Sequence, residues 1–316
     1  MGQNSLGIDI GGTRIRAAVV SPAGEVLSRA EGQTLATAAP DHIVAQVAQL
    51  VQQASRDHSP ETILSAGVCA PGPLDAPQGV AIATPTISGF VDYPLRDRIA
   101  AAIGKPTFLD HDGHAATFGE WKFGAGRGHS NMVFVTVSTG IGGGAIVDGA
   151  LQRGRKGMAA HVGHMTIDPN GPRCACENHG CWEAIAAGPA FSAKARLSGF
   201  QDGAAVFEAA RAGDATAIGL VENQSRWLAI GLVNLIHIYS PDIVVLGGGV
   251  ISGLDVMRPI LQSFIAQRAM MPFRDVPFVQ AQLLDNAGVV GAAVLAQELY
   301  LSARQTADKT TAADNL

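Results

Sequence analysis

The stretch LGIDIGGTRIRAAVV, residues 6–20, decides the fold of this chain. Apolar and β-branched residues fill 6–10 and 15–20, and the small residues between them predict a tight turn that joins two strands. Successive backbone N–H groups in such a turn can wrap a phosphate, and Thr13 adds a hydroxyl. Asp9, at the end of the first strand, is a carboxylate that can hold Mg²⁺ between phosphates. A tight hairpin with positive φ also requires these glycines, so this turn alone leaves both interpretations open.

Two further glycine-rich segments follow apolar strands. Residues 132–137 are apolar and β-branched, the loop Ser138–Gly144 reads STGIGGG, and residues 145–147 resume a strand. The triplet Gly247–Gly249 follows a strand at 243–246, where the absence of side chains would let a flat ring lie close. Each loop is a weak signal by itself, but three of them in one α/β chain point together to a bound nucleotide. The recurrence of strand, loop and strand about 130 residues apart suggests two related halves.

Apolar periodicity predicts helices that alternate with the strands, which is typical of the α/β class. A further strand is expected at 63–70, followed by a rigid loop at 71–73, and another strand at 277–283. The polar residues 305–316 are expected to fray. The expected helices span 41–56, 94–103, 115–121, 182–197, 203–212, 215–239, 253–268 and 288–303.

Composition excludes several classes of protein. A chain of 316 residues is longer than a single hydrophobic core usually accommodates, so two lobes are expected. The hydrophobic content of 47% excludes a disordered chain. The net charge of −5 comes without a basic block, which argues against a nucleic-acid partner. No apolar run approaches the roughly 20 residues of a membrane span, and the first residues lack the features of a signal peptide. We therefore expect a cytoplasmic protein with no membrane partner.

The four cysteines indicate a metal site rather than a disulfide framework. Cys69 stands alone in an apolar run, where a small buried hydrophobe is the expected role. Cys174, Cys176 and Cys181 fall within eight residues, ten residues after His164. Three thiolates and one imidazole satisfy tetrahedral Zn²⁺ and leave no open position for a catalytic water. Reduced surface cysteines beside a chance histidine are the alternative.

Three segments resemble those of the actin-like ATPase superfamily: GIDIGGT at 7–13 resembles phosphate 1, STGIGGG at 138–144 phosphate 2, and LGGG at 246–249 the adenosine motif. Between them the chain is similar to the sugar-kinase branch of the ROK family over essentially its whole length. The resemblance implies a two-lobed actin-like (ribonuclease H-like) α/β fold with a ligand cleft between the lobes. It places residues 1–114 and 289–316 in a small lobe and 115–288 in a large lobe. It also implies a homodimer.

The resemblance further implies ATP and Mg²⁺ as cofactors, and it assigns the His164–Cys181 cluster to structural Zn²⁺. The residues expected to bind ATP and its metal are Asp9, Gly11, Gly12, Thr13, Ser138, Thr139, Gly140, Gly142, Gly143, Gly247, Gly248 and Gly249.

Asp112 is the candidate general base. It follows a strand and precedes a helix, where a carboxylate can project into a cleft and accept the proton of a sugar hydroxyl. From the residues alone, a helix N-cap is the favoured explanation of an aspartate there, and only the resemblance to the family reverses this preference. The family's catalytic Asp occurs in a Glu-Asn-Asp pattern followed by alanines, and the segment Asp110–Ala116, DHDGHAA, is similar to it.

The sugar-binding positions depart from the family pattern in an informative way. His161 stands where the common Gly-Glu-x-Gly-His motif has its Glu, as it does in bacterial N-acetylmannosamine kinases. His111 and Thr86 stand where the family usually has Asn, whereas Glu183 matches the second sugar-binding carboxylate. The sugar-binding residues implied are Gly72, Thr86, His111, His161, His164 and Glu183, with His164 serving zinc and sugar together.

The expected reaction is ATP-dependent phosphorylation of N-acetylmannosamine at its 6-hydroxyl. Glucokinase or N-acetylglucosamine kinase activity is the alternative within the family. A sugar-sensing ROK regulator is a different class, but it carries a helix-turn-helix before this fold, and here the first strand begins by Leu6. A non-catalytic sugar-binding module conflicts with Asp112 and the phosphate loops.

Overall fold

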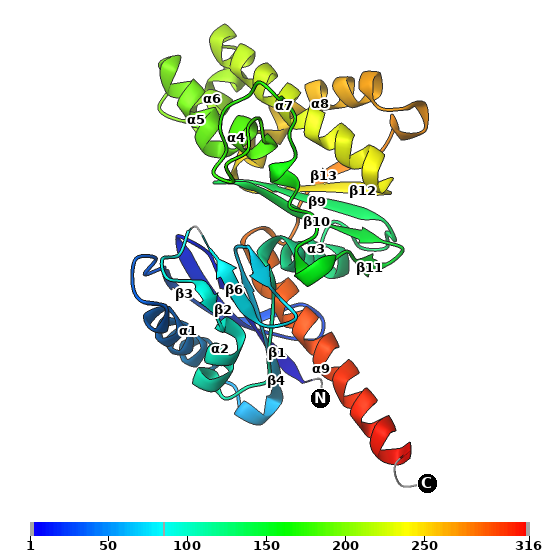
Figure 1. Ribbon diagram of the computed structural model, residues 1–316. Coiled ribbons are helices and arrows are strands. Elements are labelled where there is room, and N and C mark those ends of the chain that lie inside the picture. Colours follow the sequence, from blue (N-terminus) through cyan, green and yellow to red (C-terminus); the bar gives the residue numbers. More distant parts are fainter. Residues whose placement is uncertain (1–2, 85, 314–316) are drawn as a thin grey trace. The chain divides into compact units, whose positions relative to one another are not determined.

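The computed structural model describes residues 3–84 and 86–313, and the chain forms two compact α/β units (Figure 1). Unit 1 takes in the chain up to Phe123, the segment Arg153–Ala159 and the chain from Asp285 onward. Unit 2 takes in Gly124–Gln152 and Ala160–Leu284. The expected division after residue 114 falls inside helix α3 (Asp112–Phe123). This helix lies entirely in unit 1, where it packs on the C-terminal helix α9 (Ala287–Ala313).

Unit 1 is built on a five-stranded sheet whose first two strands are the hairpin expected at residues 6–20. The pair Ile10 and Ile15 closes the hairpin, with the glycine turn beyond it. The first three strands are antiparallel, and the last two run parallel to the first. In sheet order the strands are β3 (Val26–Gln33), β2 (Arg14–Val20), β1 (Asn4–Ile10), β4 (Ile63–Ala70) and β8 (Thr107–His111).

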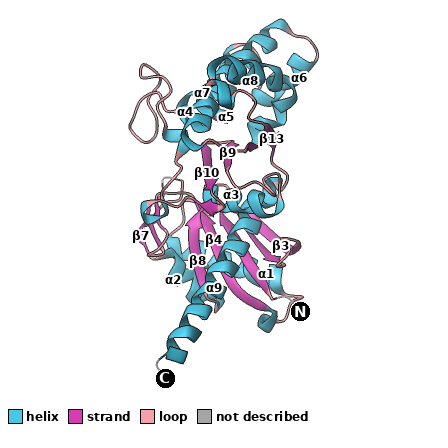
Figure 2. Cartoon of the chain, turned by 90° about the vertical axis from the view of Figure 1, so that its right-hand side faces the viewer, coloured by secondary structure: helices cyan, strands magenta, loops and turns pink. Residues whose placement is uncertain are grey.

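Helices cover both faces of this sheet. Leu6, Ile8 and Ile10 point to the face packed by α1 (Pro40–Ser55) and α2 (Leu95–Ile103). Side chains alternate along a strand, so Gly7 lies on the opposite face, where a Cβ would collide with the Val289 carbonyl of α9. Gly67 of β4 meets the Ala292 carbonyl in the same way. Figure 2 shows α9 lying along the strands β4 and β8, and these two glycines are what allow its close approach.

A small antiparallel sheet follows β4 in unit 1. It consists of β5 (Leu74–Asp75), β6 (Val80–Ala83) and β7 (Val91–Tyr93). Arg98 and Tyr93 both bind the Asp41 carboxylate, which ties this sheet and α2 to the start of α1.

Unit 2 repeats the strand arrangement of unit 1, as the duplicated pattern suggests. The first three strands of the unit, in chain order, again form antiparallel pairs, and the last two strands again run parallel to the first. In sheet order the strands are β11 (Ala150–Leu151), β10 (Ile141–Val147), β9 (Met132–Val137), β12 (Ile243–Gly247) and β13 (Phe278–Gln280). The helices are α4 (Trp182–Ala186), α5 (Gly188–Leu197), α6 (Gly203–Arg211), α7 (Ala215–Tyr239) and α8 (Leu254–Arg268).

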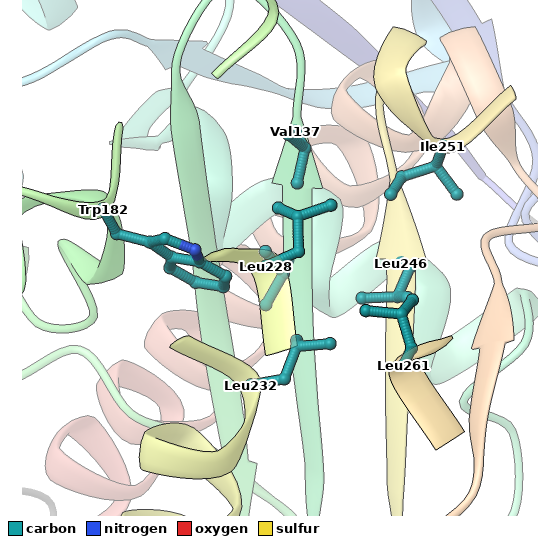
Figure 3. Close-up of a pocket in the computed structure, with 8 residues that line it drawn as sticks. Val137, Trp182, Leu228, Leu232, Leu246, Ile251 and Leu261 are labelled. Carbon is teal, nitrogen blue, oxygen red and sulfur yellow. The ribbon is translucent and has the colours of Figure 1, made fainter. Parts of the chain in front are cut away.

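Trp182 is the largest fully buried side chain of unit 2. Its indole N–H donates to the Trp227 carbonyl at 3.0 Å, and its ring packs where Gly231 of α7 has no side chain. The packing around it leaves a cavity of only about 10 Å³ (Figure 3). An apolar space of this size holds no stable water, so the core of unit 2 is dry and nearly void-free here. The cavity is lined by Val135, Val137, Trp182, Leu228, Leu232, Leu246, Ile251 and Leu261.

Two expected helices differ from those observed. The helix expected at 182–197 is broken at Ala187, because Pro189 starts a new helix there and has no N–H for the interior of a continuous one. The last helix was expected to end near 303 and to be followed by a fraying tail, which is wrong for residues 305–313. The helix continues to Ala313, since no Gly or Pro follows residue 303 to stop it.

Within the ranges 3–84 and 86–313, no helix combines the length and the apolar character needed to cross a bilayer.

Candidate active site

The turn after β1 is held open by hydrogen bonds that leave its outer side accessible. Gly11 N donates to the Arg14 carbonyl at 2.9 Å, and the Thr34 hydroxyl donates to the Gly11 carbonyl at 2.6 Å. Gly12 lies against Thr86, so a Cβ there would approach the Thr86 Cβ to 2.9 Å. Thr13 at the tip is exposed. The structure thus brings Thr86 and the turn expected to bind phosphate, Gly11–Thr13, together in unit 1.

Asp9 projects from the end of β1 into a crowded, largely buried position. Its Oδ2 lies 3.2 Å from Arg16 Nη1, and its Oδ1 accepts from the Cys69 thiol at 3.6 Å. Burial raises the pKa of Asp9 and the negative charge of Asp112 raises it further, while Arg16 opposes both effects. A cation near Asp9 would offset the free-energy cost of ionising this buried carboxyl. The carboxylate therefore fits the Mg²⁺ that the sequence predicts.

Asp112 is the first residue of α3, with 47% of its side chain exposed. Its Oδ1 accepts from the Gly113 N–H at 2.7 Å and lies 3.2 Å from His111 Nδ1. The effect of Asp112 on Asp9 shows that the two carboxylates lie within electrostatic range of each other. A half-exposed carboxylate of this kind can accept a proton from a bound alcohol.

His111 is a neutral neighbour of this carboxylate. Its side chain is 12% exposed, and burial together with the charge of nearby His114 lowers its pKa to about 4. Above pH 5 the ring therefore has one donor and one acceptor nitrogen.

Gly72, the remaining sugar-binding residue expected in unit 1, is half-buried in the loop after β4. The Thr84 hydroxyl donates to the Pro71 carbonyl at 3.3 Å, which connects this loop to the segment that carries Thr86.

The loop Ser138–Gly144 in unit 2, the second one expected to bind phosphate, is supported by Glu183. Its Oε2 accepts from the Ile141 N–H at 2.9 Å and contacts Gly140, where any Cβ would collide with it. Ser138 O accepts from Gly188 N at 2.8 Å, so the start of α5 also holds the loop. Glu183 was expected among the sugar-binding groups, and the structure gives one of its oxygens a loop-supporting contact that the sequence does not reveal.

A pocket of about 310 Å³ opens beside this loop, within the size range typical of ligand sites. Ser138, Thr139 and Gly249, all expected at the nucleotide, line it. Asp202 also lines it while accepting the Ala205 N–H at 3.0 Å as the N-cap of α6. Sequence reasoning missed most of the lining, because these residues come from α5, from α6 with its N-cap, and from the turn after β12, without a shared local motif: Gly188, Pro189, Phe191, Ser192, Asp202, Gly203, Ala204, Phe207, Val250 and Ser252.

The expected cysteine cluster is assembled in unit 2. The ligand atoms of His164, Cys174, Cys176 and Cys181 all lie within 4.8 Å of one another. Tetrahedral Zn²⁺ with bonds of about 2.0–2.3 Å requires ligand separations of about 3.3–3.8 Å. The Cys176–Cys181 sulfurs lie 3.6 Å apart, and Cys174 Sγ lies 3.7 Å from His164 Nδ1. The four cysteines are free thiols, so the donor set fits zinc rather than a disulfide.

Two thiols of this cluster respond in opposite directions to their surroundings. The Asn178 backbone N–H and the neighbouring thiols lower the pKa of Cys176, whereas burial raises the pKa of Cys181 to about 12. A divalent cation would stabilise all three thiolates at once.

His161 lies beside this cluster, with its ring centroid 6.3 Å from that of His164. His161 is half-buried and His164 is exposed. The structure therefore brings the two histidines expected at the sugar together at one end of the cysteine cluster.

Comparison with known proteins extends over nearly the whole chain. The sequence model of the ROK family matches residues 5–299. Glucokinase from Streptomyces coelicolor is 35% identical over 317 residues, covering 93% of this chain and 98% of the relative. N-acetylmannosamine kinase from Escherichia fergusonii is 33% identical over 296 residues, covering 93% of this chain and 98% of the relative.

A solved structure supports the same grouping. It is a ROK family glucokinase from Streptomyces griseus in complex with glucose and AMPPNP, with a TM-score of 0.82 and 32% identity. It covers 93% of this chain and 99% of the other, which confirms the actin-like α/β fold expected from the glycine loops. With this fold, these loops and a family match over residues 5–299, the chain belongs to the ROK family.

Proposed function

We propose that this protein is an ATP-dependent sugar kinase that phosphorylates the 6-hydroxyl of an amino sugar, with N-acetylmannosamine as its substrate. The observation that carries the kinase assignment is the pair of carboxylates in unit 1. Asp9 fits a metal, and Asp112 is half-exposed at the start of α3, within electrostatic range of it. Phosphoryl transfer needs this combination of metal position and proton acceptor, together with loops that bind phosphate.

Unit 1 would act as the small lobe and unit 2 as the large lobe. The adenosine part of ATP would bind in the 310 Å³ pocket beside Ser138, Thr139 and Gly249. The backbone N–H groups of the two glycine loops would bind the phosphates. Asp9 would hold Mg²⁺, which neutralises charge on the phosphates when bound.

Asp112 would accept the proton of the sugar 6-hydroxyl as that oxygen bonds to the γ-phosphorus and ADP leaves. Neutral His111, 3.2 Å from the Asp112 carboxylate, can orient either this carboxylate or a sugar hydroxyl. Glu183, His161 and His164 would bind the other sugar groups, with Thr86 and Gly72 completing the set. Zn²⁺ on His164 and the three cysteines would fix the loop Gly163–Glu183, which carries His164 and Glu183.

His161 supports the amino sugar as substrate. It stands at the position where glucose-type relatives of the family carry a carboxylate, and an imidazole pairs with a different arrangement of hydroxyl and acyl groups. The similarity to an N-acetylmannosamine kinase at 33% identity agrees with this choice.

Glucose is the second candidate substrate, because the glucokinase of Streptomyces coelicolor is 35% identical to this chain. Steady-state kinetics of the purified protein with a panel of hexoses and N-acetylhexosamines separate the two. We expect the highest kcat/KM for N-acetylmannosamine. A higher value for glucose would refute the amino-sugar assignment but not the kinase, and failure to phosphorylate any hexose would refute both.

We also propose that the protein is a cytoplasmic homodimer, as the resemblance to the kinase branch implies. Light scattering of the purified protein should give twice the chain mass of 32.6 kDa.

A further inference from the structure

His114 is a completely buried histidine that the proposed reaction does not use directly. It lies in the first turn of α3, two residues after Asp112. Its Nδ1 lies 2.9 Å from Asp110 Oδ1, and its Nε2 lies 3.0 Å from the Ala159 carbonyl oxygen. Both ring nitrogens are therefore within hydrogen-bond distance of an oxygen.

Both of these oxygens act as acceptors. A backbone carbonyl can only accept. Asp110 Oδ1 also accepts the His111 backbone N–H at 2.8 Å, and its Oδ2 lies 3.0 Å from Arg153 Nε. A neutral imidazole has only one N–H, so it would leave one lone pair facing an oxygen in a site closed to water. A doubly protonated ring satisfies both contacts.

Protonation of Asp110 instead would not satisfy this arrangement as well. A proton on Oδ1 would make this oxygen a weaker acceptor for the His111 N–H, and it would weaken the ion pair with Arg153. Burial favours the neutral form of Asp110, but hydrogen bonding to His114 and the charge of Arg153 outweigh it and lower the pKa of this carboxyl. Asp110 is thus a carboxylate, with Arg153 at one oxygen and the His114 ring at the other.

We propose that His114 is a positioning residue, held as a buried imidazolium, that fastens the catalytic end of β8 to the segment Arg153–Ala159. Arg153 and Ala159 belong to the same segment, and each is joined to Asp110, the first directly and the second through His114. Asp110 lies two residues before Asp112. The inference rests on the proposed role of Asp112 as the base, because the position of this carboxylate is what His114 would fix.

Other groups around His114 support a charged ring. His111, whose ring centroid is 5.7 Å away, is neutral and does not compete for the positive charge. Helix α9 packs on α3 through Gly291 and Ala292 and brings no charged side chain to this turn. Among the residues that the structure describes, the titratable and charged groups on the elements around His114 are Asp110 and His111 of β8, Asp112 in the first turn of α3, Cys69 of β4, and Arg153, Arg155 and Lys156 of the segment Arg153–Ala159. Lys156 pairs with Asp75.

Nitrogen NMR of histidine-labelled protein tests the charge state without any assay of activity. At pH 7.5 we expect one histidine ring with two protonated nitrogens whose N–H protons exchange slowly with water. Correlations between this ring and the Ala115 methyl, on the next residue of α3, would assign the signal in the unmodified protein. A His114 ring with one bare nitrogen at pH 7.5 would overturn the proposal. The result does not depend on which substrate the protein phosphorylates.

Kinetics of His114→Gln test the positioning role. A glutamine has one donor group and cannot bridge both acceptors, so we expect kcat to fall about 10- to 100-fold. The KM for ATP should stay within about two-fold, because the pocket that would bind adenosine lies in unit 2. The pH dependence of kcat should also differ between the wild type and the variant, because the glutamine lacks the ring proton that the proposal assigns to His114.

Thr117→Ser is the matched control for damage to α3. Thr117 is fully buried one turn further along and donates to the Gly113 carbonyl, and serine keeps this hydroxyl. The control should lower the melting temperature slightly and leave kcat unchanged. A folded His114→Gln protein with wild-type kcat and pH profile would refute the positioning role. If His114→Gln does not fold, His114→Asn takes its place, and the NMR result still decides the charge state.

Discussion

Burial raises the pKa of Asp9, and the charge of Asp112 adds to that effect, so ionised Asp9 costs folding free energy at neutral pH. The folded pKa lies above the unfolded one, and this cost therefore disappears as pH falls through the folded value. In the proposed kinase this cost would have a use, because a bound cation would stabilise the ionised carboxylate of Asp9.

Asp9→Asn should raise the melting temperature of the ligand-free protein at pH 7.5, because the amide carries no charge. The advantage over the wild type should shrink as the pH is lowered toward the ordinary range of an aspartate carboxyl, because the pKa of Asp9 is raised. Kinase activity should fall, since the amide binds Mg²⁺ poorly. Asp97→Asn, an exposed change in the first turn of α2, should show neither effect. An advantage that grows on acidification would contradict the assignment.

Asp112→Asn should lower kcat by at least ~10²-fold, the usual share of a general base, because an amide cannot accept the proton. Sugar binding measured by calorimetry should weaken far less. Wild-type turnover in this variant would leave Asp112 with only a structural role at the start of α3.

His161→Glu should move the specificity toward glucose. If the site recognises hydroxyls through paired hydrogen bonds, the ratio of kcat/KM for glucose to that for N-acetylmannosamine should rise about 5- to 150-fold, or roughly 1–3 kcal/mol. Both substrates must be measured on both proteins, because a loss of both activities reports only damage beside the cysteine cluster. An unchanged ratio would exclude a selective role for His161.

At the scale of elements, the folding of unit 2 depends on the cysteine loop, Gly163–Glu183, and on the packing of α7. Thr166 pairs with Cys181 and Arg173 with His179 in short β-bridges, so the loop has little regular structure apart from its ligand cluster. Stability there should depend on the metal.

Cys176→Ser should release zinc and lower the melting temperature, because a structural site contributes its binding free energy to folding. His179→Asn is the control, since His179 is an exposed histidine of the same loop outside the ligand set. Elemental analysis should find about one zinc per chain in the wild type and in the control. Fully active wild-type protein without zinc would refute the metal site.

Two glycines of α7 should respond in opposite directions to alanine. Gly231→Ala places a Cβ against the buried Trp182 ring and should destabilise by about 1–3 kcal/mol. Gly219→Ala meets open space and should stabilise by about 0.5–1 kcal/mol through helix propensity. Urea unfolding of both variants gives the comparison, and equal signs would contradict the packing described around Trp182.

At the scale of the whole molecule, the sequence predicts what depends on local pattern. The hairpin at 6–20 follows from two short apolar runs on either side of two glycines, and the cysteine cluster follows from spacing within 18 residues. Both need only neighbours in the chain. The glycine turns also indicate which strand ends would face a ligand.

Contacts between distant segments could not be predicted in this way. His114 and the Ala159 carbonyl are 45 residues apart in sequence, and no pattern at either end signals the other. Arg16 is also invisible as a partner of Asp9, because it looks like any exposed residue of an alternating strand. The pocket lining from Asp202 and Phe191 depends on how α5 and α6 pack, which periodicity alone does not specify.

The close packing of α9 on Gly7 and Gly67 has a consequence for synthesis on the ribosome. The two strands that carry these glycines, β1 and β4, are complete by Ala70, but α9 begins at Ala287, more than 200 residues later. At roughly 5–20 residues per second, the nascent sheet waits on the order of ten to forty seconds with one face uncovered. During this interval the growing polypeptide presents apolar surface to the cell, so its yield should depend on chaperones that shield unfinished chains.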